Sequence, residues 1–185
     1  MFLSHVTRQD HPCIYATCGI PGAGKSCFVD MKLENGEFPK DAYILNPDRV
    51  MVELPEYKND VRVYGAQAAY ENWELPARDL AYSLAERVLA MGGHIVKDMG
   101  CANPLSLDLI KQAKSQGYTV NMYHITCDIN EAFRRIEQRD FEISKDEVME
   151  RLKMLDALIP QYDVIADEFV TLSNTDISNP YQIAA

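Results

Sequence analysis

Residues 19–26 have the residue types and the spacing of a phosphate-binding loop. They read GIPGAGKS and fit the pattern G-x-x-x-x-G-K-[ST]. Glycines let consecutive backbone N–H groups turn toward an anion, and a side chain at either inner glycine would crowd the phosphates. Lys25 can reach the β- and γ-phosphates of a nucleotide, and the hydroxyl of Ser26 can bind Mg²⁺. The pattern therefore predicts a nucleotide held by Gly22, Ala23, Gly24, Lys25, Ser26 and Cys27.

Two aspartates follow apolar runs of strand length. Asp48 comes after the run 42–46, and Asp98 ends the run 94–98. The carboxyl ends of parallel strands meet at one edge of a sheet, where ligands bind. We therefore expect Asp48 to act as general base toward an attacking hydroxyl, and Asp98 to bind Mg²⁺ or to orient that hydroxyl. The alternative for each is a turn or capping aspartate, since Asn-Pro-Asp is good turn chemistry.

Four arginines are candidate cations for the transferring phosphoryl group, on which charge builds during the reaction. Arg135 and Arg139 are spaced i, i+4, so they would share one face of a helix. We expect Arg139 to act in catalysis. The lid or the substrate is expected to use Arg49, Arg135 and Arg151. The alternatives are a salt-bridge ladder that starts at Glu131 and, for Arg49, an ordinary surface position.

The elements that must position these residues alternate between strands and helices. Apolar runs of strand length recur between helical patterns, which predicts an α/β fold with a doubly wound parallel sheet of the P-loop NTP hydrolase type. We expect a five-stranded sheet with helices on both faces and an arginine-bearing lid. The expected strands are 13–18, 42–46, 94–98, 118–126 and 168–172.

The segments between the strands differ in how regular they look. Residues 47–64 are expected to be irregular, and the helical pattern that follows is expected to split into two pieces at Pro76. The pair Asn103-Pro104 offers an N-cap and a first-turn proline for a later helix. We expect residues 1–173 to form a single kinase domain and residues 174–185 to form a loose tail with few anchors.

The overall charge limits the classes of partner. The formal net charge is −10 and the pI is about 4.8. Extended nucleic-acid binding usually needs a basic face, so this charge argues against it while leaving room for a small basic channel at the site. The sequence has no apolar leader and no run of membrane-spanning length, so we expect a cytoplasmic protein without membrane contact.

The class of P-loop protein follows from what accompanies the loop. The sequence contains no Asn-Lys-x-Asp motif, which a GTPase would use to read guanine. A motor or AAA+ ATPase needs a longer chain with a second module. A small kinase with one P-loop remains, and it would use ATP, Mg²⁺ and a hydroxyl-bearing acceptor.

Several segments in order resemble one known group of enzymes. The sequence reads ATCGIPGAGKS, YILNPDRVM and GGHIVKDMG, followed by GYTVNMYHITCD and AFRRIEQRD. Over roughly residues 13–172 it resembles the zeta-toxin and polynucleotide-kinase-like group of P-loop kinases. The P-loop is the specific motif, and the order and spacing of the other segments strengthen the match.

The resemblance implies a doubly wound parallel sheet and an enzyme that uses ATP and Mg²⁺ to phosphorylate a hydroxyl. Zeta toxins act on the aminosugar of a nucleotide sugar and are held inactive by a small antitoxin, so it also implies an antitoxin-like partner. By position, Asp48 matches the base and Arg139 a lid arginine. The sequence departs from zeta toxins at Asp98, where they usually carry Glu. It departs again near Tyr82, close to where they carry a further acid on the preceding helix.

Three functions follow as hypotheses. The leading one is transfer of the γ-phosphate of ATP to a hydroxyl of a small molecule or nucleotide sugar. A second is a kinase for a nucleic-acid hydroxyl, at a 5′-end or on a hydroxymethylated base of phage DNA. A third, from another class, is a binding or switch protein that uses ATP occupancy without phosphoryl transfer. A closed pocket beside Asp48 would favour a small molecule, and a basic channel would favour nucleic acid.

Overall fold

One sheet of six strands forms the centre of the protein. The structure is a computed structural model and describes residues 2–138, 143–176 and 178–184. Strand order across the sheet is β2-β3-β1-β4-β5-β6. The first five strands along the chain pair in parallel, and β6 is antiparallel to β5. The strands are β1 Cys13–Cys18, β2 Tyr43–Leu45, β3 Ile95–Lys97, β4 Thr119–Thr126, β5 Glu168–Ser173 and β6 Gln182–Ile183.

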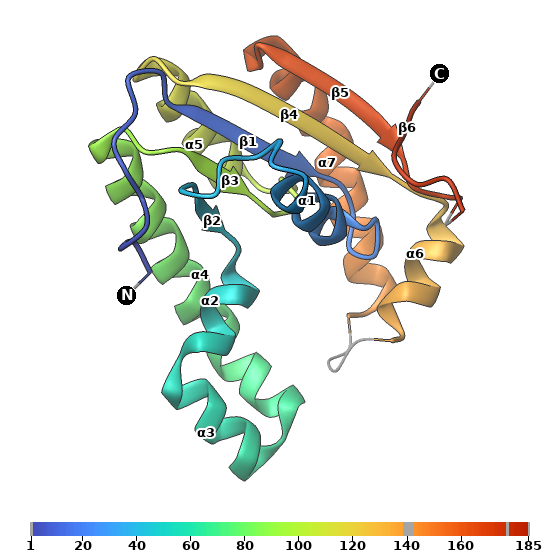
Figure 1. The fold of residues 1–185 in the computed structure, drawn as a ribbon. Coiled ribbons are helices and arrows are strands. Elements are labelled where there is room, and N and C mark those ends of the chain that lie inside the picture. Colours follow the sequence, from blue (N-terminus) through green and yellow to red (C-terminus); the bar gives the residue numbers. More distant parts are fainter. Residues whose placement is uncertain (1, 139–142, 177, 185) are drawn as a thin grey trace.

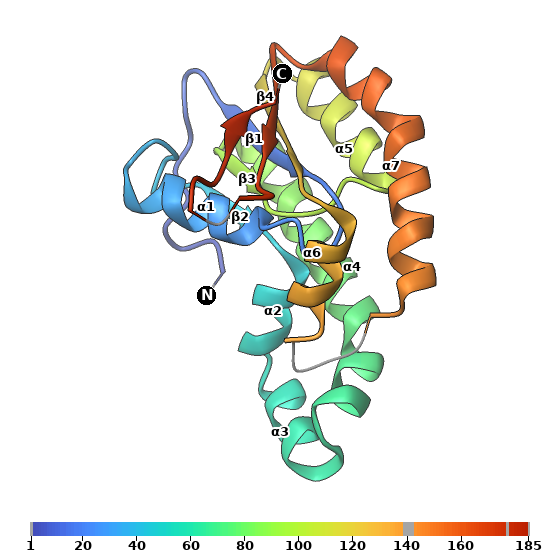
Figure 2. The same ribbon diagram turned by 90° about the vertical axis from the view of Figure 1, so that its right-hand side faces the viewer.

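Helices cover both faces of this sheet, as Figures 1 and 2 show. Helices α4, α5 and most of α7 pack on one face, with Ala85, Ile110 and Leu155 in one buried cluster. Helices α1 and α6 pack in a second cluster with Phe28 and Ile136. The helices are α1 Lys25–Glu34, α2 Pro47–Glu53, α3 Pro55–Tyr64, α4 Ala66–Met91, α5 Pro104–Ser115, α6 Ile129–Ile136 and α7 Lys145–Ile165. The predicted doubly wound α/β fold is confirmed.

The parallel strands bring the predicted chemistry to one edge of the sheet. β1 lies between β3 and β4 and pairs with both, and β2 pairs with β3. The glycine loop follows β1, Asp48 follows β2, and Asp98 follows β3 directly. All three therefore leave the sheet at the same end, which is where ligands bind in folds of this kind.

Residues 47–64 are helical, so the prediction of an irregular segment is wrong. The side chain of Asn46 accepts a hydrogen bond from the backbone of Arg49, and Pro47 occupies the first turn of α2. Pro55 occupies the first turn of α3 in the same way. A proline at this position loses no helical hydrogen bond, so each proline begins a helix here. These helices project from the sheet with the start of α4 (Figure 1).

Helix α4 runs unbroken through Pro76, whereas the sequence predicted two pieces. A proline inside a helix leaves the carbonyl four residues earlier, here that of Asn72, without its usual donor. Both residues are exposed, so water can satisfy that carbonyl. Ala77, Ala81 and Ala85 of the same helix are buried and pack it against the rest of the protein.

The sheet has six strands, so the prediction of five is wrong in number. The sixth comes from the segment for which the sequence predicted few anchors. Residues Gln182 and Ile183 pair with Ser173 and Leu172 of β5. A two-residue strand carries too little alternation to be recognised from sequence alone. Within the described parts of the chain, no helix combines the length and the apolar character that a membrane span requires.

Replacing Pro76 tests whether α4 is one helix. Pro76→Ala restores the missing backbone donor, and we expect it to raise the free energy of unfolding by about 1–2 kcal/mol. Urea denaturation measures this change. Pro104→Ala is the matched control, because Pro104 lies in the first turn of α5, where no donor is missing. Destabilisation by Pro76→Ala, or a change equal to that of the control, would show that the helix is interrupted at this residue.

Candidate active site

The loop after β1 has the backbone of an anion cradle. Gly22 and Gly24 have φ angles of 80° and 97°, which side-chain-bearing residues rarely adopt. A Cβ atom at Gly22 would lie 2.4 Å from the carbonyl oxygen of Ala132. Helix α1 begins directly after Gly24, with no side-chain cap and no acid in its first turn. Neither a capping side chain nor an acid therefore occupies the positive end of this helix, where a phosphate can bind.

The carbonyl oxygens of this loop are held from outside by distant parts of the chain. Arg135 Nη1 donates to the carbonyl of Gly22 at 3.3 Å. Asn174 Nδ2 donates to the carbonyl of Ala23 at 2.8 Å, and the Tyr181 hydroxyl donates to the carbonyl of Gly24 at 2.9 Å. These bonds orient the peptide planes of the loop, so the N–H groups that follow the bonded carbonyls turn toward the ligand side, except that of Ala23, which donates to the carbonyl of Ile20 at 3.2 Å.

Ser26 and Asp98 form a pair that suits Mg²⁺. The hydroxyl of Ser26 donates to Asp98 Oδ1 at 3.1 Å, and Asn46 Nδ2 donates to Asp98 Oδ2 at 2.7 Å. The Asp98 side chain is almost fully buried. Mg²⁺ keeps most of its water and takes only one or two protein oxygens beside nucleotide phosphates. A hydroxyl and a carboxylate next to the phosphate loop fit that requirement. Lys25 Nζ donates to the carbonyl of Ile20 at 2.8 Å.

Asp48 reaches the site from α2, a different element from the loop. It is an exposed residue in the first turn of α2 and lines the same cavity as Lys25 and Ser26. Arg49 is not among the residues that line that cavity. Its Nη2 lies 2.5 Å from Asp30 Oδ1 and 3.8 Å from Asp98 Oδ2, so it connects α1 to the Asp98 carboxylate. The lid or substrate role expected for Arg49 stays a prediction.

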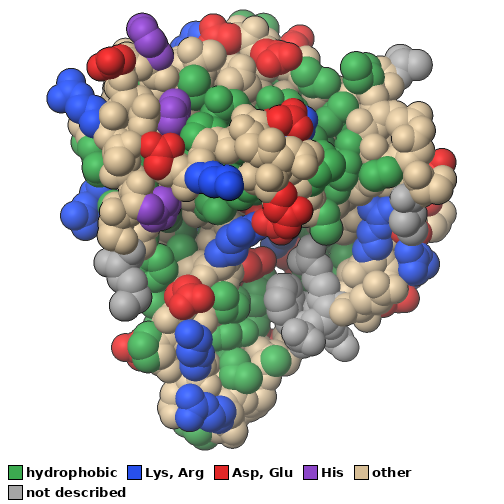
Figure 3. Space-filling view, viewed as in Figure 1, with side chains coloured by type: hydrophobic (Ala, Val, Ile, Leu, Met, Phe, Trp, Pro, Cys, Tyr) green, Lys and Arg blue, Asp and Glu red, His purple; other side chains and the backbone are tan. Residues whose placement is uncertain are grey.

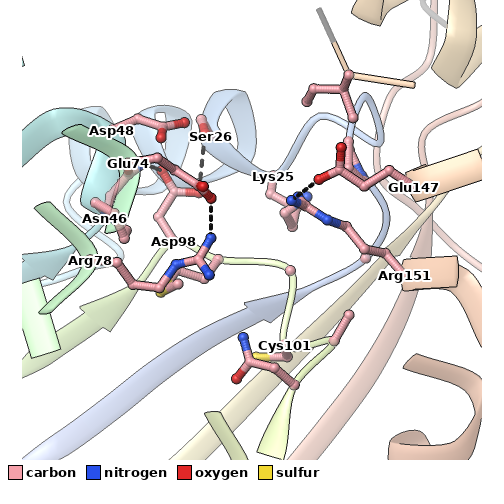
Figure 4. A pocket seen from close by; sticks show the side chains of 18 of the residues that line it. Lys25, Ser26, Asn46, Asp48, Glu74, Arg78, Asp98, Cys101, Glu147 and Arg151 are labelled. Carbon is pink, nitrogen blue, oxygen red and sulfur yellow. Dashed lines mark hydrogen bonds and ion pairs between the residues drawn. The ribbon is translucent and has the colours of Figure 1, made fainter. Parts of the chain in front are cut away.

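The cavity that joins these residues has a volume of about 390 Å³. Figure 4 shows two sides: Asp48, Glu74, Arg78 and Asp98 lie together on one, and Glu147 and Arg151 lie near Lys25 on the other. The lining holds five acids and three bases. The acids are Asp48, Glu74, Asp98, Glu147 and Glu150, and the bases are Lys25, Arg78 and Arg151.

The remaining predicted arginines have different places. Arg151 lines the cavity and pairs with Glu147 one turn earlier on α7. Arg135 lies beneath the loop, where its three guanidinium nitrogens bond to Glu131, Gly22 and Asn174. These bonds make it a brace for the loop, and the lid or substrate role expected for Arg135 stays a prediction. Arg139 lies outside the described residues.

Glu74 and Arg78 on α4 were not predicted from the sequence as site residues. The two residues form an ion pair and both line the cavity. Their i, i+4 spacing was visible in the sequence. That spacing is common on solvated helix faces, and the expected break at Pro76 would have separated the two residues. The pair could be found only once α4 was known to be continuous.

Lys97, a polar residue inside a strand, has a structural place. It is fully buried, and its Nζ donates to Cys101 Sγ at 3.2 Å. The Cys101 thiol donates to the carbonyl of Thr17 at 3.1 Å. These bonds tie the segment after β3 to β1. The carbonyl of Gly100, in that segment, accepts from the backbone N–H of Gly19 at 3.1 Å, so the tie extends to the phosphate loop.

Comparison with known proteins assigns the chain to a family. The sequence model of the family described as Zeta toxin matches residues 3–176. A search of curated proteins gave no match. A structure of the PezAT chromosomal toxin–antitoxin system of Streptococcus pneumoniae aligns with a TM-score of 0.70 and 18% identity, covering 93% of this chain and 71% of the other.

Two further solved structures share the fold at low identity. The AvrRxo1-ORF1:-ORF2 complex with ATP aligns with a TM-score of 0.64 at 16% identity, over 89% of this chain and 55% of the other. The Pnkp1/Rnl/Hen1 RNA repair complex aligns with a TM-score of 0.56 at 14% identity, over 83% and 47%. This chain thus spans only about half of those two chains. The likenesses show a P-loop kinase fold.

Removing the hydrogen bond from Tyr181 tests whether these outer contacts shape the phosphate loop. Tyr181→Phe deletes the hydroxyl bonded to Gly24 and keeps the ring, which packs 5.2 Å from Phe28. We expect the free energy of unfolding of this variant to fall by about 1 kcal/mol and its affinity for an ATP analogue to fall several-fold. Calorimetry measures both quantities. Tyr64→Phe, at an exposed tyrosine, is the control. Equal behaviour of the two variants would mean that the bond to Gly24 does not shape the loop.

The brace at Arg135 makes stability depend on pH. Hydrogen bonds from Arg134 and Arg135 hold the pKa of Glu131 at about 2, below its ordinary value of 4.5. The ionised carboxylate therefore contributes stability above about pH 4.5, and this contribution is lost as the pH falls through about 2. We expect Glu131→Gln to unfold at lower urea than the native chain at pH 7, with a difference that shrinks toward pH 2. Glu137→Gln, at an exposed glutamate on the C-cap of α6, is the control. A difference independent of pH would contradict this account.

Proposed function

The chain belongs to the zeta toxin family, and on this premise we propose that it is an ATP- and Mg²⁺-dependent kinase that transfers the γ-phosphate to a hydroxyl of a small molecule or nucleotide sugar. The observation that carries the proposal is the shared cavity. One cavity joins Lys25 and Ser26 of the phosphate loop to Asp48, a carboxylate on a different element. A donor site and a candidate base that face one space are what transfer to a hydroxyl requires.

The phosphate loop serves as the donor side in this proposal. Backbone N–H groups from Gly22 to Ser26 bind the β- and γ-phosphates at the start of α1. When ATP binds, the Lys25 ammonium group leaves the carbonyl of Ile20 and donates to the phosphates instead. Ser26 and Asp98 would hold Mg²⁺, and the ion would neutralise charge on the phosphates. Asn46 keeps the Asp98 carboxylate oriented through its hydrogen bond.

Asp48 serves as the general base on the acceptor side. Its carboxylate accepts the proton of the attacking hydroxyl as the new bond to phosphorus forms. Proline at position 47 and the cap at Asn46 fix the first turn of α2, so the carboxylate is held in place. Arg151 is the described cation on the opposite side of the cavity, and we assign it to the transferring group. Arg139 remains a second candidate on sequence grounds.

The charge of the cavity favours a small acceptor over nucleic acid. Five acids and three bases line the described cavity, which is the reverse of a basic channel. On the face shown in Figure 3, acidic and basic side chains are intermixed and form no basic stripe. Nucleic-acid binding draws most of its affinity from contacts between phosphates and basic side chains. The nucleic-acid hydroxyl is therefore the weaker alternative.

A small inhibitory protein is part of the proposal. The PezAT structure belongs to a toxin–antitoxin system, and the chain shares its fold. An antitoxin-like partner of this chain would be recognised as a protein that copurifies with it and competes with ATP for the loop. Failure of every copurifying protein to alter ATP binding would remove this part of the proposal.

Substitution of Asp48 tests the proposed reaction. The protein is incubated with labelled ATP and a panel of sugars, nucleotide sugars, nucleosides and oligonucleotides with free hydroxyls. We expect one small acceptor to be labelled and Asp48→Asn to lower the rate by about 100- to 10,000-fold, because the proton acceptor is lost. ATP binding should persist in Asp48→Asn and disappear in Lys25→Ala. Asp79→Asn, at an exposed residue of α4 outside the cavity, is the control.

The same experiment separates the rival functions. ATP binding without any labelled acceptor, together with indifference to Asp48→Asn, would support an ATP-dependent switch and contradict a kinase. Labelling confined to oligonucleotides, with strong dependence on salt, would move the acceptor to nucleic acid.

A further inference from the structure

A buried lysine and a buried cysteine meet in the segment that follows β3, and the proposed phosphoryl transfer uses neither. Lys97 is fully buried at the end of β3, and its Nζ donates to Cys101 Sγ at 3.2 Å. A buried ammonium group is usually paired with a carboxylate. The neighbouring carboxylate of Asp98 is bonded to Ser26 and Asn46 instead. Lys97 therefore presents its nitrogen to a nucleophilic sulfur.

The backbone holds the Cys101 sulfur in this place. Cys101 has a φ angle of 58°, which a residue with a side chain rarely adopts and which surrounding contacts must maintain. The Tyr162 hydroxyl donates to the carbonyl of Cys101 at 2.9 Å, and the Cys101 thiol donates to the carbonyl of Thr17 at 3.1 Å. The amine and the thiol are thus kept within reach of one another by bonds on both sides of the cysteine.

A small reagent has a route to this sulfur. Cys101 is one of the residues that line the cavity of about 390 Å³, and Figure 4 shows it among the lining side chains. The residue is only 1% exposed, so the reagent must be close to water in size. Hydrogen peroxide meets that limit and oxidises protein thiols to sulfenic acids, which a nearby nitrogen can capture.

We propose that Lys97 and Cys101 form an oxidative modification site, at which hydrogen peroxide joins the two side chains through a sulfur–nitrogen bond. The Cys101 sulfur attacks one peroxide oxygen. The S–O bond forms, the O–O bond breaks, and the departing hydroxide takes the thiol proton and leaves as water. The sulfur is oxidised by two electrons and the peroxide is reduced.

The second step uses no further oxidant. Lys97 gives its extra proton to water in the cavity, and its nitrogen attacks the sulfur. The S–N bond forms, the S–O bond breaks, and the hydroxyl leaves as a second water with one hydrogen of the nitrogen. The link spans Asp98 and Gly100, and the carbonyl of Gly100 accepts from the backbone of Gly19 at 3.1 Å. The modification is therefore tied to the phosphate loop, although its chemistry is independent of phosphoryl transfer.

Cys18 is the competing partner for an oxidised Cys101. It is a buried cysteine at the end of β1, and its thiol donates to the carbonyl of Tyr123 on β4 at 3.7 Å. The sulfur of Cys101 is instead bonded to Lys97 on β3. The contacts thus favour the lysine over a Cys18–Cys101 disulfide. The two products have the same mass, so the experiment has to distinguish them by peptide mapping.

Peptide mapping of the peroxide-treated full chain tests the proposal. Peroxide is removed, free thiols are alkylated in denaturant, and trypsin is added. Trypsin cuts after free lysines and arginines, so a linked Lys97 should leave residues 88–111 as one uncut peptide. We expect this peptide to lack two hydrogen atoms and to carry no alkyl group on Cys101. Dithiothreitol should reverse both changes. The same treatment in urea should give no link, because the contact is lost on unfolding.

Variants identify the partner of Cys101. Lys97→Met removes the amine at similar volume, so we expect the link to disappear and dimedone to trap the sulfenic acid on Cys101. Cys18→Ala should keep the link. Cys27, an exposed cysteine, is the internal control and should gain oxygen without forming a link. The map of the native chain decides the question even where Lys97→Met fails to fold.

Three outcomes would overturn the proposal. In the first, Cys101 stays fully alkylated while Cys27 is oxidised, so peroxide does not reach the buried sulfur. In the second, Cys101 gains oxygen in the native chain and trypsin still cuts after Lys97. In the third, the mapped product joins Cys101 to Cys18 and is lost in Cys18→Ala.

Discussion

The phosphate loop depends on the hydrogen bonds that hold its carbonyl oxygens away from the ligand. A loop of glycines has many conformations, and only one of them points its N–H groups inward. Three side chains, Arg135, Asn174 and Tyr181, fix the carbonyls of residues 22–24 from outside. Each contact restricts a peptide plane, so orienting a carbonyl also orients the N–H group of the next residue. The anion cradle is therefore built by its outer neighbours.

The two sides of the cavity are organised by different forces. The donor side relies on backbone geometry and on neutral or buried hydrogen bonds, such as those that hold Asp98. The acceptor side is carried by α2 and α4, and relies on the ion pair between Glu74 and Arg78. Backbone cradles suit a phosphate donor that every member of a fold shares. Side chains on added helices suit an acceptor that differs between members.

The sequence predicted the fold class, the loop and the positions of Asp48 and Asp98, because these depend on local motifs and on strand ends. The sequence-based prediction was wrong where one residue type can play two structural roles. Proline ended segments in the prediction, yet Pro47 and Pro55 begin helices and Pro76 is tolerated on an exposed face. Arg135 has the charge of a substrate residue, and only its contacts show that it is a brace. The contact between Arg135 and Gly22 joins residues 113 positions apart, and no local pattern encodes it.

The bond between Tyr181 and Gly24 joins an early part of the chain to a late one. Synthesis runs from the N-terminus, so the motif of residues 19–26 leaves the ribosome long before Tyr181 is made. A growing chain then contains the complete nucleotide signature without the outer contacts that shape it. The order of translation thus delays a finished cradle until the last part of the sheet is in place. The bond between Tyr181 and Gly24 is therefore among the last contacts of the loop that a growing chain can form.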